Sequence, residues 1–181
     1  MSIDQLKNAL PAYAKDIKLN LSSLAKEDTL NEQQLWGTFL VSALAGRNDF
    51  VIGLIENEAQ AKLSAEAFEA VKAANAVMAM NNIYYKFAGM LPDYAAMPAK
   101  LRMNIIGNPG VDKADFELWS LAVSAVNGCQ FCVKAHEKQL IDAGVSKSQI
   151  QTAVRIAAVV HAVSVVFDTE SEAIGAIKQA A

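Results

Sequence analysis

Apolar residues recur three and four positions apart along most of this chain, which is the spacing of one face of an α-helix. Between positions 65 and 87, for example, Phe68, Val71, Ala74 and Val77 would share one face. The pattern predicts a helical segment over residues 2–20, which Pro11 either kinks or divides into two helices. It also predicts helices over 32–46, 50–58, 65–87, 112–127, 129–143 and 146–167, a short helix around 95–104, and a short helix or frayed end over 169–181. The predicted fold class is all-α.

Local end signals agree with several of these boundaries. Thr29-x-x-Glu32 and Ser146-x-x-Gln149 both fit a capping box, in which the two side chains satisfy free N–H groups at a helix start. Gly144 fits the position just after a helix end, where a left-handed backbone is common. The helices are therefore expected to be separate elements joined by short turns.

The two halves of the chain resemble each other. Leu35-Trp36 is echoed by Leu118-Trp119, and both halves read as helix, turn, helix, turn and long helix. We therefore expect one all-helical domain over 1–181, made of two similar halves. The repeat covers roughly 29–87 and 112–168, and the linker 88–111 holds three of the 4 prolines.

Composition narrows the function classes. Apolar residues make up 53% of the chain, aromatic residues only 7%, and Gly and Pro are sparse, which favours closely packed helices. The net charge is −3 and no cluster of Lys and Arg occurs, which argues against a nucleic-acid partner. The longest uncharged run, 118–133, is too short to span a membrane, and residues 1–5 lack the features of a secretion signal. We therefore expect a cytoplasmic protein without a membrane partner.

The chemistry is concentrated in Asn127-Gly128-Cys129-Gln130-Phe131-Cys132-Val133-Lys134-Ala135-His136, which contains both cysteines. Asn-Gly is a turn signal, so a helix can begin at Cys129. Residues three apart on a helix share a face with Cα atoms about 5 Å apart, inside the disulfide range of roughly 4.4–6.8 Å. A helix N-terminus also lowers a thiol pKa below its usual value of about 8.5. His136 lies one turn further on and can exchange protons near neutral pH, so the segment predicts a redox-active dithiol with its own base.

Other interpretations of this segment remain open. The two cysteines could be small buried apolar residues. Cys129, Cys132 and His136, with Glu117 as a fourth ligand, could bind zinc, although the chain offers no second CxxC pair or His pair. A purely structural disulfide is less favoured, because a CxxC pair in the cytosol is more often catalytic.

Two further titratable residues need separate consideration. Glu117 stands among apolar neighbours in the first turn of the predicted helix that leads to the CxxC turn. It can orient His136 as the third member of a nucleophile–base–orienter chain. Alternatively, it can face water as a first-turn carboxylate that the helix dipole stabilises. His161 lies in an almost wholly apolar helix, which is typical of a core or interface histidine with one hydrogen bond.

The arrangement Glu117…Cys129-x-x-Cys132-x-x-x-His136 resembles the signature of the alkyl hydroperoxidase D (AhpD) family, within the AhpD/carboxymuconolactone decarboxylase-like superfamily. The likeness is nearly full length and includes the segments 1–11, 16–23, 35–38, 80–82 and 101–106. It implies an all-helical fold of two similar halves with the catalytic CxxC in the second, commonly assembled as a homotrimer. It also implies an antioxidant thiol peroxidase that serves the oxidative stress response.

The resemblance also implies roles for individual residues. Cys132 would attack the peroxide and become a sulfenic acid, and Cys129 would act as proton donor and resolve it into a Cys129–Cys132 disulfide. His136 would act as base and proton relay through a water molecule, with Glu117 supporting it. Phe131 departs from the pattern, because well-known members have His immediately before the second cysteine; a Phe there is expected to make the surroundings of Cys132 more apolar.

The same resemblance implies the partners. No bound cofactor or metal is expected, and the electron donor would be dihydrolipoamide, the lipoyl group of a partner protein. The implied partners are an AhpC-type peroxiredoxin, a lipoylated dihydrolipoamide acyltransferase and dihydrolipoamide dehydrogenase. Two other functions compete with this one: a carboxymuconolactone decarboxylase-like enzyme, which has no need of a CxxC pair, and a zinc-stabilised or redox-sensing interaction protein. A thioredoxin-type reductase is disfavoured because no β-rich pattern precedes the CxxC pair.

Overall fold

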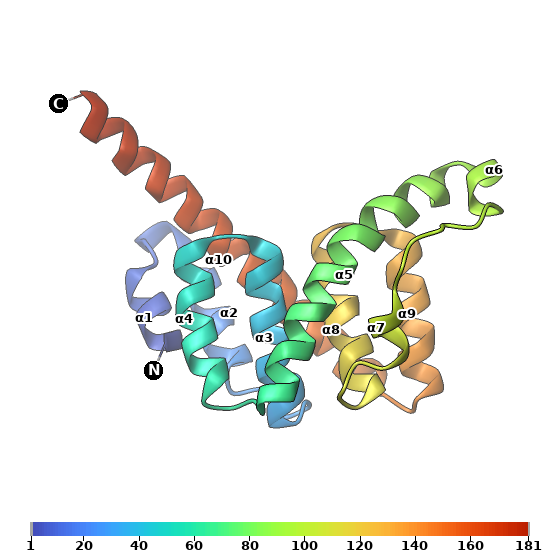
Figure 1. The fold of residues 1–181 in the computed structure, drawn as a ribbon. Helices are drawn as coiled ribbons and strands as arrows, with labels where there is room; N and C mark the ends of the chain where they lie inside the picture. The colour runs from blue at the N-terminus through green and yellow to red at the C-terminus, as the bar shows by residue number, and fades with distance from the viewer. Residues whose placement is uncertain (1, 181) are drawn as a thin grey trace.

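A computed structural model describes the backbone of residues 2–180 and the side-chain surroundings of those residues except at positions 92 and 171–180. Every regular element of this part is helical, which confirms the predicted all-α class. The elements are α1 Ser2–Ala9, η1 Ala12–Ala14, α2 Lys15–Leu24, α3 Glu32–Gly46, α4 Asp49–Gln60, α5 Ala65–Met90, α6 Pro92–Ala95, α7 Asn104–Gly107, α8 Lys113–Val126, α9 Gln130–Asp142 and α10 Lys147–Ala180 (Figure 1).

Helices α3 and α8 form the centre of the bundle. They pack against each other, and each also contacts α5 and α10. Gly37 permits this close approach, because a Cβ atom at that position would lie 2.4 Å from the indole of Trp119, which is fully buried. A larger residue at Gly37 would therefore push α8 away from α3, and α8 is the helix that carries Glu117.

Helix α10 covers one side of this centre. Its segment Lys147–Glu170 is long and apolar enough to cross a membrane by length and composition, but half of the apolar segment is buried inside the protein. Inward-facing residues such as Ile156, Val160 and Val163 are buried in the core. These contacts identify the described part of α10 as a core helix of the bundle.

Several predicted boundaries need correction. The expected helix around 95–104 is wrong: α6 ends at Ala95, the first residue of this stretch, and α7 begins at Asn104, its last residue. Pro98 disfavours a helical backbone at the residue before it. Thr29 does not cap α3, since Asn31 and Gln34 form the capping box there. The terminal segment 169–180 continues α10 rather than forming a separate helix, and position 181 lies outside the described residues. The single domain with its internal repeat stays a prediction.

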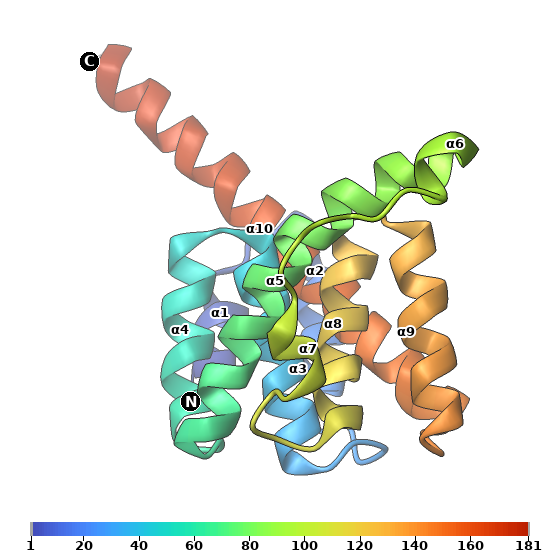
Figure 2. The ribbon, with the colours of Figure 1, turned by 45° about the vertical axis from the view of Figure 1, so that its right-hand side comes forward.

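The turn between α8 and α9 places the CxxC segment against α5. Asn127 ends α8, Gly128 adopts a left-handed backbone with φ of 64°, and the N–H group of Cys129 then donates to the carbonyl oxygen of Ser124 over 3.0 Å. Glycine is suited to this turn because it has no Cβ to clash. Figure 2 shows α8 and α9 side by side, and α5 contacts both of them. The site is therefore built from three helices.

Candidate active site

Cys129 and Cys132 form a disulfide at the start of α9. Their Cα atoms are 5.3 Å apart, which confirms the distance expected from the spacing. Cys129 is the N-cap of α9, and its Sγ accepts a hydrogen bond from the N–H group of Cys132 over 3.3 Å. The exposed fractions of Cys129 and Cys132 are 0% and 4%, so the sulfurs lie just below the surface. A disulfide at a helix N-terminus can be opened to a dithiol whose thiolate is stabilised by the free N–H groups.

His136 and Glu117 form a buried pair beside this disulfide. Nδ1 of His136 lies 2.6 Å from Oε2 of Glu117, and the exposed fractions of the two side chains are 11% and 6%. The interpretation of Glu117 as a water-facing residue is therefore wrong. Because a carboxylate can only accept, it holds a proton on Nδ1 and leaves Nε2 as the nitrogen that can take or release a proton. The structure brings Glu117, Cys129, Cys132 and His136 together, as the sequence predicted.

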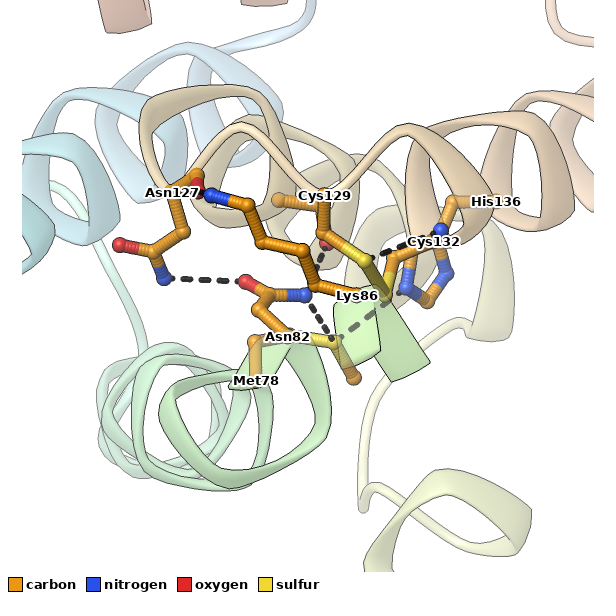
Figure 3. Close-up of a disulfide and its surroundings, with 8 residues drawn as sticks. Met78, Asn82, Lys86, Asn127, Cys129, Cys132 and His136 are labelled. Carbon is orange, nitrogen blue, oxygen red and sulfur yellow. Dashed lines mark hydrogen bonds between the residues drawn. A yellow bond between two sulfur atoms is a disulfide. The ribbon is translucent and has the colours of Figure 1, made fainter. Parts of the chain in front are cut away.

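Met78 of α5 is a residue of the site that the sequence analysis missed. Its Sδ lies 3.3 Å from Nε2 of His136, and the side chain is buried (Figure 3). The two ring nitrogens of His136 therefore have partners from two different helices, Nδ1 from α8 and Nε2 from α5.

Asn82, one turn beyond Met78 on α5, connects that helix to the CxxC turn through hydrogen bonds. Its Nδ2 donates to Oγ of Ser124 over 2.9 Å, and its Oδ1 accepts from Nδ2 of Asn127, also over 2.9 Å. Lys86 lies one turn further and donates through Nζ to the carbonyl oxygen of Asn127 over 3.2 Å. Figure 3 shows Asn82 and Lys86 reaching from α5 toward Asn127, beside the disulfide. The spacing 78, 82 and 86 is the signal that could have identified this face of α5.

Phe131 lies at the mouth of the site rather than in its interior. Its side chain is stacked on Tyr85 of α5, with ring centroids 5.5 Å apart, and 51% of the residue is exposed. Together with Lys86, Lys134 and Gln130, the two rings line a groove of about 350 Å³. This groove adjoins the disulfide because Gln130 and Phe131 are the two residues between the cysteines.

The zinc interpretation is not supported by this arrangement. The two sulfurs are bonded to each other and Glu117 is bonded to His136. In the part of the chain that is described, no group of three or more His, Cys, Asp or Glu side chains is placed to hold a metal ion.

His161 lies elsewhere, and its interpretation as a core residue is wrong. It is exposed on α10 and lines a shallow cavity of about 290 Å³ with Ala125, Val126 and Val154. Helix α10 turns this position outward, although its neighbours Val160 and Val163 are buried. The alternative interpretation, an interface histidine, stays a prediction.

The fold and the site define a class: an all-helical protein with a thiol–disulfide pair at a helix N-terminus and a carboxylate-bound histidine one turn away. The sequence profile of the Carboxymuconolactone decarboxylase family matches residues 92–172. The alkyl hydroperoxide reductase AhpD of Maricaulis maris is 57% identical over 94% of this chain and 100% of that protein. Its counterpart in Gluconacetobacter diazotrophicus is 60% identical over 93% of each chain, and that of Streptomyces coelicolor is 56% identical over 94% of this chain and 97% of its own length.

The chain therefore belongs to the AhpD family, as the resemblance indicated. The all-helical architecture with the CxxC disulfide in the second half agrees with this assignment.

Proposed function

We propose that this protein is an antioxidant thiol peroxidase, which reduces alkyl hydroperoxides through a dithiol–disulfide cycle at Cys129 and Cys132. The observation that carries the proposal is the buried Glu117–His136 pair beside a disulfide at a helix N-terminus. A disulfide that only stabilised the fold would not need a carboxylate-oriented histidine one turn away. The names of the relatives support the same reaction for those proteins.

The oxidative half-reaction begins with the dithiol. His136, oriented by Glu117, takes the proton of Cys132, and the resulting thiolate attacks the outer peroxide oxygen. The O–O bond breaks, the alcohol leaves with a proton, and Cys132 becomes a sulfenic acid. The sulfur of Cys129 then attacks this sulfenic sulfur, water leaves, and the Cys129–Cys132 disulfide forms. Two electrons pass from the two thiols to the peroxide.

The reductive half-reaction returns the dithiol. A dithiol donor of the dihydrolipoamide type attacks the disulfide, forms a mixed disulfide, and leaves as its own cyclic disulfide. His136 can supply the proton that the departing protein thiolate needs. The donor would be a lipoylated dihydrolipoamide acyltransferase that is recharged by dihydrolipoamide dehydrogenase, and an AhpC-type peroxiredoxin would be a second acceptor of electrons.

The assembly and location belong to the same proposal. A homotrimer would bury exposed apolar residues on α10, such as Ala158 and Val165, near His161. Thiol-based turnover suits the reducing cytoplasm, where the partner thiols remain reduced. A decarboxylase of the carboxymuconolactone type is less favoured, because such a reaction gives the cysteine pair no role.

The test is consumption of tert-butyl hydroperoxide by the metal-free protein with dihydrolipoamide as donor, with and without a peroxiredoxin. Turnover that depends on Cys132 would establish the dithiol as the working site. Absence of turnover under both conditions, together with zinc in the protein as purified, would favour a structural or redox-sensing role instead. The homotrimer is tested separately by the mass of the protein in solution.

A further inference from the structure

We propose that Lys86 of α5 binds the thiolate of Cys129 as its cation partner when the cysteine pair is reduced. This inference rests on the proposed dithiol cycle and names the group that stabilises its resolving thiolate. Lys86 lies against the CxxC turn: its Nζ donates to the carbonyl oxygen of Asn127 over 3.2 Å, and a Cβ atom added at Gly128 would lie 3.7 Å from this nitrogen. The ammonium group is therefore adjacent to the residue that precedes Cys129.

The turn between α3 and α4 has the same local geometry as the CxxC turn. Arg47 adopts a left-handed backbone with φ of 63°, as Gly128 does with φ of 64°. Asn48 then caps α4 by accepting from the N–H group of Val51 over 3.0 Å, just as Cys129 caps α9. Asn48 therefore occupies, at this turn, the position that Cys129 occupies at the other.

At the α3–α4 turn, the covering helix α10 contacts the cap residue directly. Phe167 of α10 packs edge-on against Phe50, which lies two residues after Asn48, with ring centroids 4.9 Å apart. The next residue of α10, Asp168, accepts a hydrogen bond from Nδ2 of Asn48 over 2.6 Å. The position after the aromatic residue on the covering helix can therefore reach the side chain of the N-cap.

At the CxxC turn, α5 takes the place of α10. Tyr85 stacks on Phe131, which lies two residues after Cys129, and Lys86 follows Tyr85 directly. Lys86 thus occupies the position that Asp168 occupies at the other turn, and the N-cap side chain within its reach is that of Cys129. The partners are complementary in both cases, since an amide donor faces a carboxylate at one turn and a thiolate acceptor would face an ammonium group at the other.

The contact depends on the redox state of Cys129. In the disulfide its sulfur carries no charge, and Lys86 donates to a backbone carbonyl oxygen. An ammonium group has three donors, so Nζ can keep this hydrogen bond and also bind the sulfur once it becomes a thiolate. Of the other charged or titratable side chains at the site, Glu117 and His136 are bonded to each other, and Lys134 lies further along, on the second turn of α9.

The ion pair places a nucleophile beside the sulfenic acid. As the peroxide O–O bond breaks, Cys129 gives its proton to the departing alkoxide and becomes a thiolate, which Lys86 stabilises. This thiolate attacks the sulfur of the Cys132 sulfenic acid, the S–S bond forms and the S–O bond breaks. The released hydroxide takes the proton that His136 removed from Cys132 and leaves as water. Lys86 keeps its charge throughout, and its effect is to keep Cys129 deprotonated until the disulfide forms.

The test is the pKa of the Cys129 thiol in the Cys132→Ser protein, which has a single cysteine, followed by the ultraviolet absorbance of the thiolate. We expect Lys86→Gln to raise this pKa by about 0.5–1, because an opposite charge at an exposed position lowers it only moderately. Lys86→Arg should restore the parent value, since the positive charge returns. In about 0.5 M salt the difference should shrink, because exposed charges are screened.

Lys134→Gln is the matched control, because it removes the same charge from the other wall of the groove that Lys86 lines. It should raise the pKa of Cys129 by less than half as much as Lys86→Gln does. Equal shifts would show a general effect of positive charge rather than a contact, and would overturn the inference. An unchanged pKa in Lys86→Gln would overturn it as well, because that is the result expected if Lys86 only holds the turn through Asn127.

A second measurement follows the consequence for the reaction. With less Cys129 thiolate, the sulfenic acid on Cys132 persists longer and meets a second peroxide more often. We expect mass spectrometry to find about two- to fivefold more sulfinic acid on Cys132 per turnover in Lys86→Gln than in the parent protein, with Lys86→Arg close to the parent. Equal oxidation of Cys132 in Lys86→Gln and the parent would overturn the role of Lys86 in resolution.

The pKa measurement does not depend on peroxide turnover, so it separates this inference from the proposed function. If peroxide is not consumed but Lys86→Gln raises the pKa of Cys129, the proposed function fails and the ion pair stands. If peroxide is consumed and the pKa is unchanged, the proposed function stands and the inference about Lys86 is overturned.

Discussion

Nδ1 of His136 lies 2.6 Å from Oε2 of Glu117, in a pair that is almost completely shielded from solvent. The two residues come from consecutive helices, α8 and α9, which the CxxC turn connects. The position of the turn therefore fixes both the sulfurs and the orientation of the imidazole. Because Nδ1 donates to the carboxylate, Nε2 is the ring nitrogen that can take or release a proton, and it lies on the side of α5.

Glu117→Gln should reduce peroxide turnover by about 10- to 100-fold, because the amide no longer fixes the Nδ1 proton or stabilises the protonated ring. His136→Phe removes the base itself and should lower the rate further. The measurement is kcat/KM for tert-butyl hydroperoxide as a function of pH, with folding checked by circular dichroism. An unchanged rate and pH profile in His136→Phe would show that the base is a different group.

The two cysteines should behave differently when replaced one at a time. Cys132→Ser should abolish turnover, because it removes the peroxide-attacking sulfur. Cys129→Ser should react once and retain a sulfenic acid or a mixed disulfide on Cys132, because no resolving thiol is present. Mass spectrometry after one equivalent of peroxide distinguishes the two variants by the addition of one oxygen atom. A trapped oxygen on Cys129 in the Cys132→Ser variant would reverse the assigned roles.

The sequence was sufficient for those parts of the site that are close together in the chain. Cys129, Cys132 and His136 share a helix face, and Glu117 precedes the same turn, so local geometry was enough to relate them. The all-α class followed from helical spacing in the same way. The predicted cap of α3 was wrong because a second capping residue lies two positions away from Thr29. Asn31, not Thr29, is the N-cap of α3.

The contribution of α5 could not be derived from local spacing. Met78 lies 58 positions before His136 and contacts it only because α5 packs on α8 and α9. A buried methionine in an apolar helix is usually core filler, and nothing in its own segment distinguishes Met78 from that case. The orientation of His161 depends in the same way on tertiary packing, since α10 buries some faces and leaves others exposed.

Met78→Leu should preserve the core and change the proton chemistry. Leucine has a similar volume, so the unfolding free energy should fall by less than about 1.5 kcal/mol. Loss of the thioether contact leaves Nε2 without its partner on α5, so the rate of disulfide reduction should fall by about two- to tenfold. Stopped-flow reduction by dihydrolipoamide measures the rate. Met80→Leu, on the same helix, is the control, and an equal fall in both variants would contradict a role for Met78.

Gly37→Ala should destabilise the protein through the contact between α3 and α8. The added Cβ would lie 2.4 Å from the buried indole of Trp119, so the helices must separate, at a cost of about 1–3 kcal/mol. Gly53→Ala in α4 is the matched control: apart from the adjacent residues and the backbone of its own helix, no atom lies within 4 Å of the added Cβ, and the change should stabilise the helix by about 0.4–1 kcal/mol. Urea unfolding measures both. Equal effects of the two substitutions would show that α8 can move away from α3 without cost.

Asn82→Ala and Asn81→Ala provide a test of the link between α5 and the CxxC turn. Both side chains are buried on α5, but they differ in their partners. Asn82 bonds Ser124 and Asn127, whereas Oδ1 of Asn81 has no hydrogen-bond partner within the described structure. Removing the Asn82 side chain leaves its partners without hydrogen bonds, which costs about 1–3 kcal/mol. Removing the Asn81 side chain takes away a buried oxygen that has no hydrogen bond to lose, so the cost is smaller.

We therefore expect Asn82→Ala to lower the unfolding free energy clearly more than Asn81→Ala in urea titrations of the oxidised protein. Because the same bonds hold the turn before Cys129, Asn82→Ala should also increase the rate at which a small thiol reduces the disulfide, while Asn81→Ala should not. The second measurement separates a local effect on the turn from a general loss of stability. If the two variants were equal in both stability and reduction rate, the hydrogen bonds from Asn82 would not position the CxxC turn.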